Sequence, residues 1–373
     1  MDKIKIFHIS DIHVGMKFLR YPDSVKNSLI DARFEVIQRA VSVADELKCD
    51  IMAITGDIFE NIKVSKREVE RVTQTLKAFS GSAIWILPGN HDYYNDTLQL
   101  WQWFKASMPD HAIILDTPER KRFEIEELNV DIYPAPCDRK HSETNALEWL
   151  KQMPVEKDAV NIVLAHGAIK EISPDLNGNY FPMSLEELNA LKQDLVLIGH
   201  THVPYPPVAE ATAKVYNAGT PEPDGLNYQH EGGGWYIEID ATKRIMAKRI
   251  PLGQFRFFDV TLTLSDEVNE SMFYGMFSGY PLEKIVARIK VGGYLTQSVF
   301  ERRQSVYERV KKSFHHLEIE EIALKPKFTR EEVDRMFTVG SVPYVLLTKL
   351  FDDGDVATAH LALELMHEVM NHD

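Results

Sequence analysis

Cysteine is scarce in this sequence, since only Cys49 and Cys137 occur among 373 residues. Two cysteines are too few for a disulfide framework or for a metal site built from thiolates. The sequence also lacks an apolar run long enough to cross a bilayer, and its first ten residues, MDKIKIFHIS, lack the apolar core of a signal peptide. We therefore expect a protein of the reducing cytoplasm that has no membrane partner.

An excess of positive charge is missing as well. Lysine and arginine number 42 against 56 aspartate and glutamate residues, which gives a formal net charge of −14. This balance argues against a protein that coats nucleic acid through bulk charge. It leaves open an enzyme that acts on phosphates through bound metal ions, because the cations supply the local positive field.

The first 253 residues alternate short apolar runs with amphipathic stretches, which is the pattern of an α/β domain. Ser65 with Glu68 forms a capping box, and Ser184 predicts another capped helix. Strands are expected at 4–10, 49–55, 83–88, 161–166 and 195–199, with a long helix at 24–47 and a closing hairpin over 233–240 and 244–252.

The character of the sequence changes after residue 253. Strand-like and helix-like stretches over 254–325 predict a smaller α+β domain, and 326–373 reads as a helical tail. Thr329, followed three residues later by Glu332, marks the expected start of a helical segment in that tail.

Metal-competent side chains follow five predicted strands of the first domain. In chain order they are Asp11 and His13, Asp57, Asn90 and His91, His166, and His200 and His202. Ligands collect at the carboxyl ends of strands in open α/β sheets, so we expect these side chains to meet at one edge. His166 alone would suit a structural hydrogen bond, and Asp57 alone would suit a helix cap. The whole ordered set is hard to explain by packing.

The residue types indicate the kind of metal. Carboxylate, amide and imidazole ligands without thiolate suit Mn²⁺, Fe²⁺ or Zn²⁺ better than Ca²⁺ or a structural zinc. Seven candidate ligands exceed the needs of one ion but fit two ions that share a bridging carboxylate. Such a pair clamps the attacking and leaving oxygens of an in-line displacement at phosphorus, and a nearby imidazole can protonate the leaving oxygen.

The ordered motifs resemble those of the calcineurin-like metallophosphoesterase superfamily over most of residues 1–253. They are Asp11-x-His13, Gly56-Asp57, Gly89-Asn90-His91-Asp92, His166 and Gly199-His200-x-His202. The resemblance implies a four-layer α/β/β/α sandwich and two divalent metal ions. It places Asp11, His13 and His202 on one ion, Asn90, His166 and His200 on the other, and Asp57 between them. It also implies that His91 is a catalytic imidazole and not a ligand.

Four stretches narrow the resemblance to SbcD-type DNA double-strand-break repair nuclease subunits. They are SDIHVG (10–15), GDIFE (56–60), PGNHD (88–92) and the later YNAGTPEPDG (216–225) with GGGWYIEI (232–239). That likeness implies a Mn²⁺-dependent 3′→5′ exonuclease and single-strand endonuclease that forms a homodimer through helices of the nuclease domain. It further implies a capping domain over 254–325 that positions DNA, and a tail over 326–373 that binds an SbcC-type SMC-like ATPase. One departure is Glu60, at a position where some family members carry histidine and others an acid.

Several alternatives remain open. The chain could be a phosphodiesterase for nucleotides or other small phosphodiesters, although the extra domain counts against this, or mainly a DNA-tethering scaffold. The apolar stretch 97–108 suits core packing or a dimer contact. The basic stretch 301–312 suits a solvated helix face or a DNA-facing surface, and 357–370 suits a core helix or a groove for a partner coiled coil.

Overall fold

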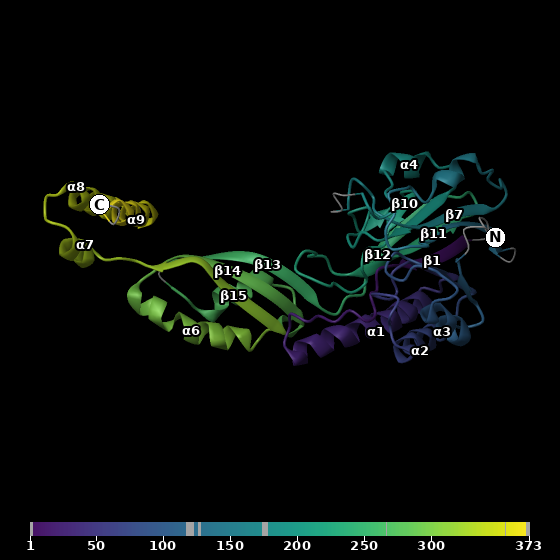
Figure 1. Cartoon of the computed structure of the whole chain (residues 1–373), viewed down its shortest axis with the longest axis horizontal. Helices are drawn as coiled ribbons and strands as arrows, with labels where there is room; N and C mark the ends of the chain where they lie inside the picture. The colour runs from purple at the N-terminus through teal and green to yellow at the C-terminus, as the bar shows by residue number, and fades with distance from the viewer. Residues whose placement is uncertain are drawn as a thin grey trace. The chain divides into compact units, whose positions relative to one another are not determined.

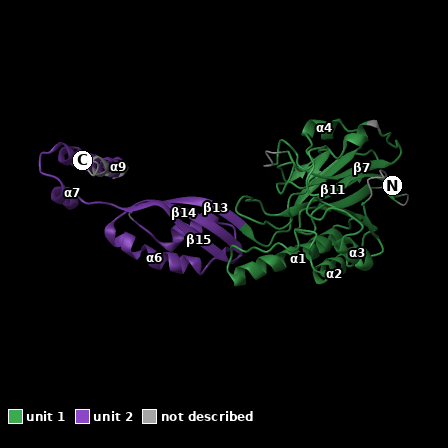
Figure 2. Cartoon of the chain, in the orientation of Figure 1, with its two compact units in different colours: residues 1–256 green, residues 257–373 purple. Residues whose placement is uncertain are grey.

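The computed structural model describes residues 3–116, 123–125, 128–173, 178–265, 267–354 and 356–370 (Figure 1). The chain divides into two compact units, residues 1–256 and residues 257–373 (Figure 2). The expected boundary near residue 253, and the separation of a cap over 254–325 from a tail over 326–373, remain predictions.

Two sheets form the first unit. The larger has the order β4-β3-β2-β1-β11-β12-β9, in which β1 to β4 run parallel and β11 and β12 form an antiparallel hairpin. Its strands are β1 (Lys3–Ile9), β2 (Ile51–Thr55), β3 (Ala83–Leu87), β4 (Ala112–Ile114), β9 (Glu210–Ala211), β11 (Gly233–Asp240) and β12 (Ile245–Pro251). The hairpin expected near residues 233–252 is confirmed.

The second sheet has the order β10-β8-β7-β6-β5. Its first four strands are mutually parallel, and β5 pairs with β6 in the antiparallel sense. The strands are β5 (Phe123–Ile125), β6 (Val130–Ala135), β7 (Val160–His166), β8 (Leu195–Gly199) and β10 (Val215–Asn217). Every residue of β7 and β8 is buried, as expected for parallel strands covered on both faces.

Three apolar clusters lie between the layers of helices and sheets in this unit. The inner faces of the two sheets meet in a core that includes Ile6, Trp85, Leu197 and Trp235. The outer face of the larger sheet packs against helices α1 (Asp23–Glu46), α2 (Lys66–Leu76) and α3 (Gln99–Ser107). The outer face of the second sheet packs against α4 (Leu185–Ala190) and the 3₁₀ segment η2 (Glu148–Gln152). The α/β/β/α sandwich predicted from the motifs is therefore confirmed.

Local sequence signals account for several boundaries. The capping boxes at Ser65 with Glu68 and at Ser184 with Glu187 are both formed. The strand expected from residue 49 begins at Ile51, because the chain is still turning from α1 at Cys49.

The apolar stretch around α3 packs into the core, where Leu100, Trp101 and Phe104 are buried. A dimer contact through the helices of this unit remains a prediction. Among the helices that the structure describes, none is both long and apolar enough to span a bilayer.

The second unit begins with a three-stranded sheet of order β13-β14-β15, covered by α6. The bounds are β13 (Arg256–Ser265), α5 (Glu270–Tyr274), η3 (Gly275–Phe277), η4 (Leu282–Lys284), β14 (Ile285–Leu295), α6 (Gln297–Lys311) and β15 (His316–Pro326). Helices α7 (Arg330–Met336), α8 (Val342–Asp352) and α9 (Val356–Met370) follow. The capping box of Thr329 with Glu332 opens α7, so the smaller α+β element and the helical tail of the predicted fold class are present.

Candidate metal centre

Side chains from five strand ends converge in the first unit. Contacts of 2.8–3.8 Å link all of the residues singled out in the sequence. The loops after β1, β2 and β3 supply Asp11 and His13, Asp57, and Asn90 and His91, while β7 ends at His166 and the loop after β8 supplies His200 and His202. The two sheets thus contribute to one cluster, as the rule for the carboxyl ends of parallel strands predicts.

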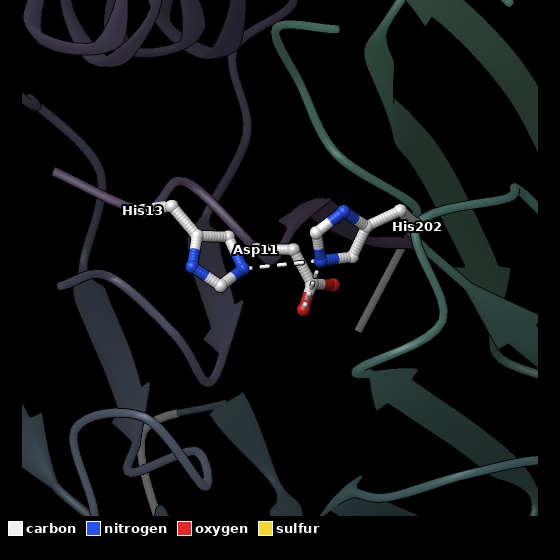
Figure 3. Close-up of side chains that lie close together, drawn as sticks. All are labelled: Asp11, His13 and His202. Carbon is white, nitrogen blue, oxygen red and sulfur yellow. Dashed lines mark hydrogen bonds and ion pairs between the residues drawn. The ribbon is translucent and has the colours of Figure 1, made fainter. Parts of the chain in front are cut away.

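The first pocket consists of Asp11, His13 and His202 (Figure 3). Nε2 of His13 lies 3.1 Å from Nε2 of His202, and Oδ1 of Asp11 lies 3.8 Å from the same His202 nitrogen. Asp11 and His13 are buried, and His202 is partly buried. Three potential ligand atoms therefore face a common point.

The second pocket consists of Asn90, His166 and His200. Oδ1 of Asn90 lies 3.0 Å from Nε2 of His166 and 2.9 Å from Nδ1 of His200. Asn90 and His166 are fully buried. One oxygen and two nitrogen donors therefore converge here without a thiolate, a donor set that suits Mn²⁺, Fe²⁺ or Zn²⁺.

Asp57 lies between the two pockets. Its Oδ2 is 3.2 Å from Nε2 of His166 and 3.8 Å from Nε2 of His13. Its Oδ1 accepts the backbone N–H of His91 at 2.8 Å. The carboxylate is thus fixed at the position from which it can reach an ion in either pocket.

The backbone at this centre is held in an uncommon conformation. Asp11, His13, Asp57 and His200 have φ angles of 55°, 54°, 53° and 97°, in the left-handed region that non-glycine residues seldom adopt. Such strain persists only where surrounding structure over-determines it, and it concentrates at functional sites. Gly199 has a related role, because a Cβ there would lie 2.0 Å from the backbone oxygen of Thr55. Glycine lets this strand end approach the neighbouring sheet.

The two imidazoles of the first pocket face each other through their Nε2 atoms. Nδ1 of His13 donates to Oε2 of Glu60 at 2.8 Å. Oδ2 of Asp224 lies 2.6 Å from Nδ1 of His202, a distance that fits an ion pair although the contact is not aligned as a hydrogen bond. With both Nδ1 atoms protonated, neutral rings would point two lone pairs at each other across 3.1 Å. A cation or an added proton relieves this repulsion, so the residues fit a metal ion.

Burial and neighbouring charges shift the pKa values of three ionisable side chains in the cluster. Burial lowers the pKa of His166, but the adjacent Asp57 carboxylate outweighs it and raises that pKa to about 9. Burial likewise opposes the ionisation of Asp57, yet His166 and His13 hold its pKa well below the usual range. Burial lowers the pKa of His202, but the adjacent Asp224 carboxylate raises it more strongly, to about 9. Divalent ions compete for the sites that these protons occupy.

His200 behaves differently from the other imidazoles. Burial and the nearby His166 lower the pKa of His200 to about 3, which keeps this ring neutral and able to donate a lone pair. A neutral imidazole is the form that can bind a metal ion.

His91 borders the cluster without entering either pocket. Its side chain is 27% exposed, and its Nδ1 donates to the backbone oxygen of Glu60 at 2.8 Å. Its ring packs edge-on against His13 with 4.9 Å between centroids. His91 therefore faces solvent beside the pockets, where an incoming substrate could reach it.

Some residues of the centre were not identified from the sequence. Asp92 accepts backbone N–H groups from Gly89 at 2.7 Å and Phe59 at 3.1 Å, which joins the loops after β2 and β3. Burial and Asp57 raise the pKa of Asp92 to about 7. Its place in the Gly-Asn-His-Asp motif was a usable signal. Asp224 lies in the stretch YNAGTPEPDG, which belongs to the resemblance, but the sequence alone assigned it no role.

Two tyrosine rings flank the pockets and were also not predicted. The Tyr180 ring lies 5.1 Å from the His200 ring, and the Tyr228 ring lies 5.4 Å from the His202 ring, measured between centroids. Both side chains are partly exposed. Each pocket therefore has an aromatic wall that a substrate can contact.

The basic helix α6 is largely neutralised by acidic neighbours. Arg303 pairs with Glu321 at 2.7 Å, and Arg309 pairs with Glu270. Whether the stretch 301–312 is a solvated helix face or a DNA-facing surface remains a prediction.

Comparison with known proteins gives a family match. The calcineurin-like phosphoesterase family matches residues 4–204, which is more than half of the chain. No curated protein matches the sequence. Each of the eight candidate residues lies within the matched range.

Three solved structures match part of this chain with low sequence identity and low TM-scores. TT1561 of Thermus thermophilus is 12% identical, with a TM-score of 0.37 over 66% of this chain and 98% of that one. A dimetal phosphatase from Danio rerio is 12% identical, with a TM-score of 0.35 over 68% of this chain and 100% of that one. Yfce, a phosphoesterase from E. coli, is 13% identical, with a TM-score of 0.29 over 67% and 100%. Similarity this low carries no argument about substrate.

Proposed function

Because the chain belongs to the calcineurin-like phosphoesterase family, a family of metal-dependent phosphoester hydrolases, we propose that its substrate is DNA. In this proposal the protein is an SbcD-type nuclease with 3′→5′ exonuclease and single-strand endonuclease activity. The observation that carries the proposal is the pair of pockets sharing Asp57, in a chain that continues into a second unit with a helical tail.

The proposed ligand sets follow the two pockets. Asp11, His13 and His202 would hold one ion, Asn90, His166 and His200 would hold the other, and Asp57 would bridge them. Carboxylate, amide and imidazole donors without thiolate suit Mn²⁺, Fe²⁺ or Zn²⁺, and the likeness to SbcD-type nucleases makes Mn²⁺ the proposed metal. When bound, such ions neutralise the charge that develops on a phosphodiester during in-line displacement.

His91 would serve as the proton donor to the leaving oxygen. Its Nδ1 proton is committed to the Glu60 backbone oxygen, which can only accept a hydrogen bond. To act as a proton donor in this role, the ring would carry a further proton on Nε2. Transfer from Nε2 to the departing oxygen of DNA would leave the neutral tautomer already fixed by Glu60.

One feature of the site supports a nucleic-acid substrate in particular. Tyr180 and Tyr228 provide aromatic surfaces beside the pockets, and aromatic rings stack against bases regardless of sequence. The acidic total charge does not oppose this proposal, because bound cations would provide the local attraction for phosphate.

The helical tail would bind the partner ATPase. Helices α7 to α9 and their connections expose large apolar side chains, which is typical of a protein-binding surface. They are Met336, Val339, Val342, Val345, Leu346, Leu361 and Leu365, with exposed fractions between 43% and 80%. An SbcC-type SMC-like ATPase could present a coiled coil to such a surface.

Substrate choice is tested by comparing linear and single-stranded DNA with bis-p-nitrophenyl phosphate and cyclic nucleotides at equal Mn²⁺ concentration. We expect kcat/KM to be highest for DNA and cleavage of the linear substrate to proceed from its 3′ ends. A protein that cleaves the small phosphodiesters efficiently but leaves DNA intact would overturn the proposal in favour of a small-molecule phosphodiesterase.

A further inference from the structure

Two carboxylates lie behind the imidazoles of the first pocket. Oε2 of Glu60 contacts Nδ1 of His13 at 2.8 Å, and Oδ2 of Asp224 contacts Nδ1 of His202 at 2.6 Å. In both rings the nitrogen facing into the pocket is Nε2, and these Nε2 atoms lie 3.1 Å apart. Each imidazole of this pocket is therefore oriented from behind by a negative charge.

Both carboxylates are themselves held in place. The Asp224 side chain is 6% exposed, in a loop that the buried Arg33 guanidinium fastens through the backbone oxygen of Pro223 at 3.2 Å. The Glu60 side chain is 29% exposed, and its backbone N–H donates to the backbone oxygen of Val14 at 2.9 Å. Glu60 is thus anchored by its main chain beside the loop that carries His13.

The imidazoles of the second pocket lack this support. Nδ1 of His166 donates to the backbone oxygen of Thr55 at 2.8 Å, which is a neutral acceptor. Nδ1 of His200 faces Asn90 within the pocket. Among the residues that the structure describes, no carboxylate pairs with the outward nitrogen of either ring, and Asp57 is the only carboxylate within the pocket group.

A carboxylate behind a ligating imidazole fixes the ring tautomer and raises the basicity of the nitrogen facing the metal. It also adds negative charge close to the ion. The first pocket has Asp11 as a ligand, with Glu60 and Asp224 in contact with its imidazoles from behind. Among the described residues of the second pocket, the shared Asp57 is the carboxylate that contacts an imidazole, while the nearby Asp92 carboxylate accepts backbone N–H groups of Gly89 and Phe59. The two pockets consequently differ in charge although each offers three protein ligands besides Asp57.

We propose that Glu60 and Asp224 are positioning residues that make the Asp11–His13–His202 pocket the tighter of two metal sites, so that this pocket fills first and the Asn90–His166–His200 pocket fills second. The inference rests on the two-ion centre of the proposed function. It assigns a role to Glu60, the departure seen in the motif after β2, and to Asp224, to which the sequence motifs gave no function.

Titration of the metal-free protein with Mn²⁺ tests this assignment without any measurement of activity. Calorimetry, with the free-Mn²⁺ signal in electron paramagnetic resonance as a second readout, should resolve a tight and a weak site in the wild-type protein. Glu60→Gln and Asp224→Asn each keep the shape of the side chain but remove its charge. Each should weaken the tight site by roughly 10–100-fold and leave the weak site nearly unchanged.

Two further variants make the result specific. Asn90→Ala, in the second pocket, should weaken the weak site and spare the tight one. Glu70→Gln removes an exposed charge on α2 whose partner is Lys66, 3.5 Å away, and should change neither site. Melting temperatures of the metal-free variants identify any that fail to fold, and the partly exposed Glu60 provides a variant that tolerates substitution if Asp224→Asn does not.

Equal affinity of the two sites in the wild-type protein would overturn the inference. So would an equal loss at both sites in Glu60→Gln, or no loss at either. Because binding is measured in the absence of DNA, a protein with graded sites that fails to cleave DNA would contradict only the proposed nuclease function. A nuclease with two equivalent sites would contradict only the present inference.

Discussion

At the scale of single residues, hydrogen bonds to Glu60 occupy one ring nitrogen of His13 and one ring nitrogen of His91. The Nδ1 atoms of His13 and His91 are both committed to Glu60, one to its carboxylate and one to its backbone oxygen. The remaining Nε2 atoms are therefore the ones available for metal in one ring and for proton transfer in the other. A single glutamate thus fixes the chemistry of two histidines.

Replacement of His91 by alanine separates metal binding from catalysis. Since His91 belongs to neither pocket, His91→Ala should retain both ions, while DNA cleavage falls by about 10²–10⁴-fold through loss of the proton donor. Metal content by atomic emission and cleavage of 3′-labelled DNA provide the two readouts. Cleavage at the wild-type rate would show that the assigned proton donor is wrong.

At the scale of secondary-structure elements, the strand ends were predictable and their supports were not. Apolar runs followed by Asp, Asn or His located the ends of β1, β2, β3, β7 and β8 directly. Asp224 could not be predicted, because its position depends on contacts distant in sequence, such as that of Arg33 with the loop from Thr220 to Pro223. The packing of one sheet against the other is likewise a tertiary property that no local pattern encodes.

Gly199 provides a test of the close approach between the two sheets. In Gly199→Ala, the new Cβ would meet the Thr55 oxygen at 2.0 Å and the Ser10 Cβ at 2.8 Å, so β8 must shift and carry His200 and His202 with it. We expect a loss of about 1–3 kcal/mol in the free energy of unfolding, with weaker Mn²⁺ binding. Gly225→Ala is the matched control, because a Cβ there has nothing within 4 Å. Equal stability of the two variants in chemical denaturation would contradict this account.

The pairing of β13 with β14 includes a charge contact that depends on pH. The Arg288 guanidinium hydrogen-bonds Asp259 at 2.6 Å, Lys290 lies 3.1 Å away, and together they lower the pKa of Asp259 from 3.8 to about 2. Because the folded-state pKa is depressed, the stabilisation is present above pH 4 and is lost as pH falls towards 2. Asp259→Asn should therefore lower the melting temperature at pH 7 by about 1–4 °C, and this difference should shrink between pH 4 and pH 2. A constant difference across that range would contradict the assigned contact.

At the scale of the whole molecule, the sequence predicted a phosphoesterase sandwich followed by a smaller α+β element and helices. The sandwich was predictable because the motifs fix the order of strands and ligands. The role of the second unit was harder to predict from the sequence, because an apolar helix such as α9 can belong to a core or form a partner-binding surface. Leu361 and Leu365 are 56% and 53% exposed, and the binding of a partner there remains a proposal.

Charge placed on the tail should abolish partner binding without affecting chemistry. Leu361→Asp combined with Leu365→Asp disrupts the exposed apolar face of α9, so binding to an SbcC-type coiled coil should fall at least about 100-fold. Hydrolysis of bis-p-nitrophenyl phosphate should be unchanged, because that reaction needs only the first unit. Thr338→Asp adds charge at an exposed position between α7 and α8 and serves as the control. Undiminished binding of the double variant in calorimetry would exclude α9 as the docking site.

The central claim is that two ions held by the shared-Asp57 cluster cleave DNA. The most direct measurement is a nuclease assay on DNA with defined, 3′-labelled ends, performed with the wild-type protein in Mn²⁺, in Mg²⁺ and in EDTA. The account predicts loss of the 3′ label in Mn²⁺ and complete inhibition by EDTA. Absence of cleavage with every metal, or cleavage that persists in EDTA, would contradict it.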